Sequence, residues 1–245
     1  MWYITTYEPV ALISLKMATA TSTGGKSLLL PTPFAYKMAL LGVALSGAGL
    51  EQGMALWPHI RDADVAVRGP EQIVANNTFA KIMKPARGKA ELDPDTGLIE
   101  SMNHTIGFRE YVQWHGDCRL AIRLPDKNEI DWKQWLTSIH YIGKRGGLLQ
   151  AVDSFQSATE PDATFTYLTQ SHRAFRLDGT LQLMDDCAED VTFDQVNIYS
   201  SKSMRLGKDR ILRHVIIPYR QVRSSRGYTL YERIDDTEES AVDTI

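Results

Sequence analysis

Cysteine is nearly absent from this sequence, which contains only Cys118 and Cys187 among its 245 residues. Neither has a second Cys or a His beside it at metal-ligand spacing, and the six histidines are scattered along the chain. These absences argue against a disulfide framework and against a zinc site. We therefore expect reduced thiols, no bound metal and no cofactor.

Long apolar runs are also lacking. No uninterrupted apolar stretch reaches the roughly 18 residues of a membrane span, and the N-terminus has no basic segment followed by a cleavable apolar one. A cytoplasmic location without a membrane partner is the expectation. Apolar residues still make up 43% of the chain, which is enough for one large domain core or two small ones.

Acidic residues are missing from one stretch and concentrated in another. Residues 202–226 contain eight Lys and Arg and a single acid, Asp209, whereas residues 232–245 hold six acids and one base. Removing the net −5 of that tail from the chain's −3 leaves residues 1–231 at about +2. The basic stretch indicates either a polyanion partner or a solvated strand face that the tail balances.

The first half of the chain shows alternating strand and helix patterns. Residues 2–7 and 10–15 favour an opening strand. Thr32 and Pro33 then predict a helix start, because the Thr hydroxyl can accept from a free helix amide and Pro needs no N–H there. Apolar side chains recur at helical spacing up to Gly47 and Gly49, which predict the end of this helix.

Residues 64–68 predict a strand, and residues 70–107 predict a protruding hairpin. Strands at 109–114 and 118–124 follow. Asp131 predicts the cap of a second helix, whose apolar stripe comprises Trp132, Trp135, Leu136 and Ile139, with Gly143 just beyond its end. A strand at 148–155 completes the split βαβ order of a ferredoxin-like fold.

The sequence thus predicts an α+β protein in three parts: a ferredoxin-like domain at 1–157, a β-rich region at 158–234 and an acidic tail at 235–245. Within the β-rich region, short strands are predicted at 163–169, 174–184, 191–199, 211–217 and 228–234.

Two glycine-rich, cationic segments stand next to the ends of the predicted helices. The first is Ser22–Ser27, with Gly24, Gly25 and Lys26, and the second runs from Gly143 through Lys144 and Arg145 to Gly147. Glycines let a backbone approach a polyanion closely, and the cations supply charge-assisted bonds. Both segments therefore suit a phosphate, although a flexible loop and simple compensation of the helix dipole explain them as well.

Two catalytic interpretations compete with simple binding. Ser22–Ser27 resembles the end of a Walker A loop, but Ala20 replaces its leading glycine, and Pro31 and Pro33 prevent a helix from starting at Lys26. His140, with Tyr141 and Lys144, could cleave RNA by general acid–base catalysis, or could simply close the second helix.

The segments Gly25–Leu40 and Ile139–Leu149 together resemble CRISPR-associated family five. This family comprises the RAMP subunits that cap the 5′ end of the crRNA in type I CRISPR Cascade complexes. The resemblance implies a non-catalytic protein that holds the 5′ handle of the guide RNA and starts the filament of backbone subunits. Its implied partners are the crRNA, a backbone RAMP subunit, the large subunit and, through the complex, target DNA.

The same resemblance implies which residues touch RNA. One branch of the family cleaves precursor RNA with a set of Tyr, Lys and His residues. This sequence has no convincing match to that set, so no cleavage is expected. Residues 70–107 correspond to the family's thumb hairpin, with Lys81, Lys84, Arg87 and Lys89 as its RNA-binding cations. The handle would lie against the remaining candidates, which are Gly24, Gly25, Lys26, Ser27, Lys37, Gly143, Lys144, Arg145 and Gly146.

Overall fold

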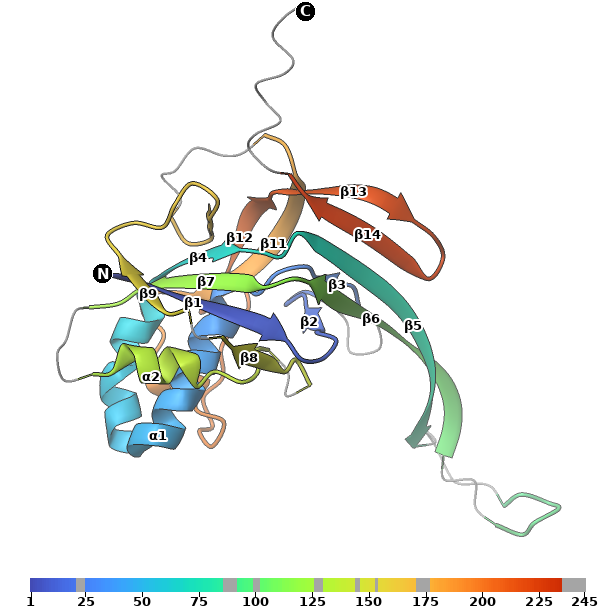
Figure 1. The fold of residues 1–245 in the computed structure, drawn as a ribbon. Helices are drawn as coiled ribbons and strands as arrows, with labels where there is room; N and C mark the ends of the chain where they lie inside the picture. The colour runs from blue at the N-terminus through green and yellow to red at the C-terminus, as the bar shows by residue number, and fades with distance from the viewer. Residues whose placement is uncertain are drawn as a thin grey trace, which may run out of the picture.

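A computed structural model gives the fold and describes residues 1–20, 25–85, 92–98, 102–125, 130–143, 146–152, 154–170 and 177–234. Its central sheet has the strand order β10-β4-β7-β1-β8, and β9 also pairs with β1. The strands are β1 (Trp2–Pro9), β4 (Asp64–Arg68), β7 (Cys118–Arg123), β8 (Leu149–Ala151), β9 (Gln156–Ala158) and β10 (Thr166–Tyr167). Helices α1 (Pro33–Arg61) and α2 (Trp132–Thr137) lie together on one face of this sheet (Figure 1).

The connections of the central sheet follow from its pairing. β7 lies antiparallel between β1 and β4, the two strands that α1 connects. β1 in turn lies antiparallel between β7 and β8, the two strands that α2 connects. Apolar residues cover both faces of the sheet. A small cluster around Trp2, Ala121 and Phe165 packs apart from the main core.

Helix α1 begins where the sequence predicts. The Thr32 hydroxyl accepts a hydrogen bond from the Ala35 amide at 3.1 Å, and Pro33 occupies the first turn. At Gly49 the backbone leaves helical geometry (φ 84°, ψ 176°), so the first helical segment ends there as predicted. A second helical segment continues to Arg61, and the sequence did not predict it.

The same helix satisfies the length and hydropathy criteria for a membrane span. In this fold, however, it packs into the protein interior: the side chains of Tyr36, Leu40 and Ile60 are fully buried. The Lys37 ammonium, close to the helix start, bonds to a carboxylate of another element. These contacts identify α1 as a core helix.

Helix α2 is shorter than predicted. Its cap is confirmed, because Asp131 Oδ1 accepts from the Gln134 amide at 3.0 Å. The helix ends at Thr137 with Ser138 as its C-terminal cap, so Ile139 lies beyond it. Gly143 therefore does not end this helix, and its positive φ of 70° belongs to the turn that follows.

The predicted hairpin is present and is longer on its return side than expected. β5 (Gln72–Pro85) and β6 (Met102–His115) pair continuously from Gln72↔His115 to Pro85↔Met102. Together they curve away from the body of the protein as a two-stranded ribbon (Figure 1). The ribbon leaves its side chains largely open to solvent along its outer half.

The C-terminal third is mostly β-structure. β11 (Thr180–Cys187) pairs with β12 (Arg210–Ile217). β13 (Tyr219–Ser224) and β14 (Tyr228–Arg233) extend the hairpin into a sheet of order β13-β14-β5-β6. A further small pair joins β2 (Leu15–Lys16) to β3 (Ser27–Leu28).

One strand prediction in this region is wrong. Residues 191–199 contain the short helix α3 (Phe193–Val196) instead of a strand. The predicted boundary after residue 157 also separates strands that share sheets, because β10 pairs with β4 and β14 pairs with β5. The predicted acidic tail, 235–245, lies outside the described residues.

Both cysteines are free and buried. Burial raises the pKa of the Cys187 thiol to about 12. Such a thiol stays protonated and unreactive at neutral pH. Among the residues that the structure describes, no group of three His, Cys, Asp or Glu side chains is placed to hold a metal ion.

Candidate nucleic-acid interface

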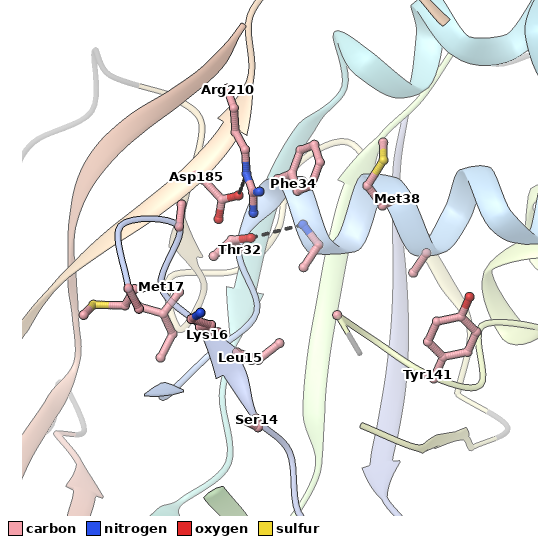
Figure 2. A pocket seen from close by; sticks show the side chains of 16 residues that line it. Ser14, Leu15, Lys16, Met17, Thr32, Phe34, Met38, Tyr141, Asp185 and Arg210 are labelled. Carbon is pink, nitrogen blue, oxygen red and sulfur yellow. Dashed lines mark hydrogen bonds and ion pairs between the residues drawn. The ribbon is translucent and has the colours of Figure 1, made fainter. Parts of the chain in front are cut away.

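A pocket of about 430 Å³ opens where α1 begins (Figure 2). Four parts of the chain wall it: residues 14–20, the first turns of α1, the turn after α2, and the β11–β12 pair. We call it the α1-start pocket. Its volume lies within the range of pockets that hold small ligands, roughly 300–1,000 Å³.

The pocket lies beside both glycine-rich segments. Gly143, at the start of the second segment, lines it, and so does Ala20, which stands just before the first. A Cβ built on Gly25 would lie 2.9 Å from the Ala20 Cβ, and one built on Gly143 would lie 2.9 Å from Leu15 Cδ2. A side chain at either place would therefore press on a neighbouring side chain, and glycine avoids that contact. Lys26 is exposed beside Gly25, whereas Gly24 lies outside the described residues.

Backbone hydrogen bonds join the chain on the two sides of the second segment. The Ile142 amide donates to the Gly147 carbonyl at 3.0 Å, and the Leu149 amide donates to the His140 carbonyl at 2.9 Å. Gly143 and Gly146, which follow and precede these bonded residues, are exposed. Lys144 and Arg145, between them, lie outside the described residues.

Gly143→Ala is expected to lower the free energy of unfolding by about 1–2 kcal/mol. The positive φ of 70° is unfavourable for any L-side chain, and the new Cβ would press on Leu15. Gly146→Ala is the matched control. It has no positive φ, and a Cβ there meets nothing within 4 Å, so a change within about 0.5 kcal/mol is expected. Equal urea midpoints for the two variants would contradict the assignment of Gly143.

The helix start adds a directional positive potential. The Ala35 amide is occupied by the Thr32 hydroxyl, and the Tyr36 amide donates to the Thr32 carbonyl at 3.1 Å. The first turn carries no acidic side chain, so nothing within it neutralises the positive end of the helix dipole. Pro33 has no N–H and the Ala35 and Tyr36 amides are bonded to Thr32, so this helix start favours negative charge nearby through its dipole.

Arg210 from β12 forms the opposite wall. Its guanidinium lies over the Phe34 ring, 4.2 Å from the ring centroid, and its Nε donates to the buried Asp185 carboxylate. The Arg210 side chain remains 32% exposed. Figure 2 shows this arrangement facing Lys16 across the start of the helix. Lys16, Arg210 and Asp185 together contribute a net charge of +1 to the pocket.

Two residues that were predicted to contact phosphate, Lys37 and Ser27, are bonded to other parts of the protein. The Lys37 ammonium is buried and donates to Asp186 Oδ1 and to the Arg61 carbonyl, both at 2.7 Å. Ser27 is also buried: its hydroxyl accepts from the Leu15 amide at 2.8 Å, and its amide donates to Glu110 Oε2 at 2.6 Å. The predictions for Lys37 and Ser27 are therefore corrected, because both hold the fold together away from solvent.

The two described thumb cations lie away from the pocket residues. Lys81 and Lys84 are exposed on β5, in the ribbon that extends away from the body of the protein (Figure 1), and their odd spacing directs them to opposite faces of that ribbon. Phe79 and Phe108 pair across the same ribbon with ring centroids 5.3 Å apart. Arg87 and Lys89 lie outside the described residues. A Walker A loop requires a helix that starts at its Lys, but no helix starts at Lys26, because Ser27 and Leu28 form strand β3.

Sequence reasoning did not assign Lys16, Asp185 or Arg210 to the site. Arg210 belongs to the basic stretch 202–226, but nothing in that stretch distinguishes it from its neighbours. Lys16 and Asp185 carry no local signal, because they meet at the pocket only through long-range packing. Tyr141 was named only as a possible partner of His140 in catalysis. The alternating apolar pattern that predicted β11 and β12 could have placed Arg210 on a strand, but it could not have placed that strand beside α1.

The fold and this pocket define an α+β protein with a pocket of net positive charge at the start of its first helix. The chain is 26% identical over 209 residues to CRISPR-associated protein Cas5 of Archaeoglobus fulgidus. The matched region spans 83% of this chain and 87% of that protein. This comparison confirms the resemblance to CRISPR-associated family five that the two glycine-rich segments indicated.

Solved structures align with the chain at lower similarity. The crystal structure of a CRISPR protein from Archaeoglobus fulgidus covers 96% of this chain and 92% of its own, with a TM-score of 0.47 and 13% identity. A chain of a CRISPR RNA-guided surveillance complex covers 96% and 89%, with a TM-score of 0.42 and 13% identity. No protein-family model matches the chain.

Proposed function

We propose that this chain is a non-catalytic crRNA-binding subunit of a type I CRISPR Cascade complex, which holds the 5′ handle of the guide RNA and nucleates the backbone filament. The observation that carries the proposal is that Gly143, from the second glycine-rich segment, and Ala20, next to the first, line one pocket at the start of α1. The similarity to Cas5 supports it independently.

The arrangement of the chain suits that role. The sheet order β8-β1-β7-β4, with two helices on one face, supports a ferredoxin-like RAMP domain, from which the β5–β6 ribbon projects as a thumb. RNA that is held by its shape and backbone needs phosphate contacts more than base readout. The α1-start pocket supplies the phosphate site, and the ribbon supplies a second RNA surface. A backbone RAMP subunit and the large subunit would cover neighbouring faces, and target DNA would be reached only through the complex.

The test is the salt dependence of RNA binding. For Lys144→Ala/Arg145→Ala, we expect the log–log slope of affinity against salt to fall by about 1.4, since each phosphate contact with a single strand contributes about 0.7. Lys133→Ala, which removes an exposed cation from α2, is the control and should keep the wild-type slope. Fluorescence anisotropy with a labelled repeat RNA measures both. An unchanged slope in the double variant would remove these residues from the interface.

One observation supports a second candidate, a metal-independent endoribonuclease that processes precursor crRNA. His140 is exposed, and its ring lies 5.1 Å from the Tyr141 ring between centroids. Its Nδ1 lies 3.2 Å from the Ser138 carbonyl oxygen, so a proton on Nδ1 leaves Nε2 to accept one. Incubation of the chain with repeat RNA in EDTA decides between the candidates. A product that His140→Ala abolishes would establish the enzyme, whereas intact RNA supports the non-catalytic role.

A further inference from the structure

A second pocket of about 360 Å³ lies between α1 and α2. We call it the interhelical pocket. It shares Ala39 and Tyr141 with the α1-start pocket, so the two pockets adjoin at these residues. A Cβ built on Gly42 would lie 4.0 Å from Tyr141 Oη, which places the phenol hydroxyl over α1. A ligand that occupies one pocket therefore borders the other.

The two walls of the interhelical pocket differ in chemistry. The α1 wall is made of small side chains, including Gly42, Ser46 and Gly47, which leave open a slot. The facing wall is aromatic and comprises Trp135, His140 and Tyr141. Trp135 is held by an edge contact to the Trp132 ring, with centroids 5.7 Å apart, and the backbone of His140 is fixed by the Leu149 amide. The aromatic wall is thus anchored before any ligand arrives.

Polar groups at the mouth complete the pocket. Gln134 and Ser138, both exposed, line it beside His140. The Ser138 hydroxyl donates to the Gln134 carbonyl at 2.6 Å, which leaves its oxygen as an acceptor, and the Gln134 side-chain amide offers both a donor and an acceptor. A flat aromatic wall with amide and hydroxyl groups at its edge is the chemistry by which proteins hold an unpaired base.

We propose that the interhelical pocket binds one unstacked base of the RNA whose phosphate occupies the α1-start pocket. The inference rests on the proposed function and adds to it a base-binding site. Tyr141 lines both subsites, so a phosphate in one pocket and the base of an adjoining nucleotide in the other would both contact it. The phosphates provide affinity there, and the base fixes the register of the strand.

An abasic scan tests this directly. Anisotropy titrations of the full chain would use repeat RNAs in which one nucleotide at a time lacks its base. For wild-type protein we expect one position to weaken binding by about 5-fold to about 150-fold, the range for loss of one stacked base. Every other abasic position in the handle should change affinity much less.

Filling the pocket supplies the matched variant. Ser46→Leu places a larger side chain in the slot from an exposed position of α1, whereas Gln52→Leu makes a similar change on the same helix outside the pocket. Ser46→Leu should weaken binding of intact RNA as much as the abasic change does, and combining the two should cause no further loss. Gln52→Leu should retain the full abasic effect. His140→Ala is a second variant with an exposed side chain, and it should reduce the abasic effect without altering the salt slope.

The outcomes separate this inference from the proposed function. Salt-dependent RNA binding with a flat abasic scan would overturn the base site and leave the handle-binding role intact. The base site would also be overturned if Ser46→Leu bound RNA normally but lost a protein subunit that copurifies with the wild-type chain, because the occupant would then be a protein side chain. Absence of any RNA binding would overturn both.

Discussion

Lys37→Met should lower the free energy of unfolding by about 3–5 kcal/mol, the cost of removing one partner of a buried ion pair. The Lys37 side chain is 3% exposed and that of Asp186 is 2% exposed, so neither charge has water as an alternative partner. The pair joins α1 to β11. Its loss would leave the Asp186 carboxylate with Arg213 and the Cys187 amide as partners in a site built for two cations.

Urea unfolding measures this effect as a lower midpoint at an unchanged slope. Lys26→Met is the control, because Lys26 is exposed and its loss should change stability by no more than about 0.5 kcal/mol. RNA binding by folded Lys37→Met protein should keep the wild-type salt slope. A reduced slope with unchanged stability would instead return Lys37 to the set of phosphate contacts.

Arg210→Gln should both destabilise the protein and weaken RNA binding, and a second substitution separates the two effects. Loss of the charged hydrogen bond to Asp185 should cost about 2 kcal/mol of stability. The double variant Arg210→Gln/Asp185→Asn has no carboxylate at position 185 that lacks a cation. Most of the stability lost in Arg210→Gln should therefore be recovered in it. RNA affinity should stay about tenfold below that of the wild type in both variants, because the cation that faces the pocket is missing in each.

Asp185→Asn alone completes this cycle. It removes the only acid among the residues that line the α1-start pocket, so RNA binding should be equal to or tighter than that of the wild type. Wild-type affinity in the double variant, measured by anisotropy at a fixed salt concentration, would show that Arg210 serves only to neutralise Asp185. Its place on the Phe34 ring would then be structural.

Local chemistry predicted the starts of helices well. The caps of α1 and α2 bond to amides only three residues further along the chain. The sequence alone was therefore sufficient to place the start of each helix, at Thr32–Pro33 and at Asp131. The short helix at 193–196 was missed although a local signal exists: the Thr192 amide donates to Gln195 Oε1 at 2.9 Å, as in a capping box. The apolar residues Val191, Phe193 and Val196 suggested a strand and masked that signal.

The ends of elements and the partners of charges depended on distant parts of the chain. α2 ends at Thr137, although the apolar residues at helical spacing continue to Ile139. Ile139 is buried from a position beyond the helix, so its apolar character did not require a helical backbone. Lys37 was expected to contact the RNA handle because of the family resemblance, and only the fold brings Asp186, 149 residues away, to its ammonium. The two glycine-rich segments were predicted as sites, but the Arg210 wall between them was not.

The way the α1-start pocket is assembled also limits when it can work. Its two facing cations, Lys16 and Arg210, stand 194 positions apart in the chain. Because such long-range contacts form late in folding, the pocket is complete only when β12 has docked beside α1. A partly folded chain, or one in which the β11–β12 pair opens, therefore keeps Lys16 but lacks the guanidinium that faces it.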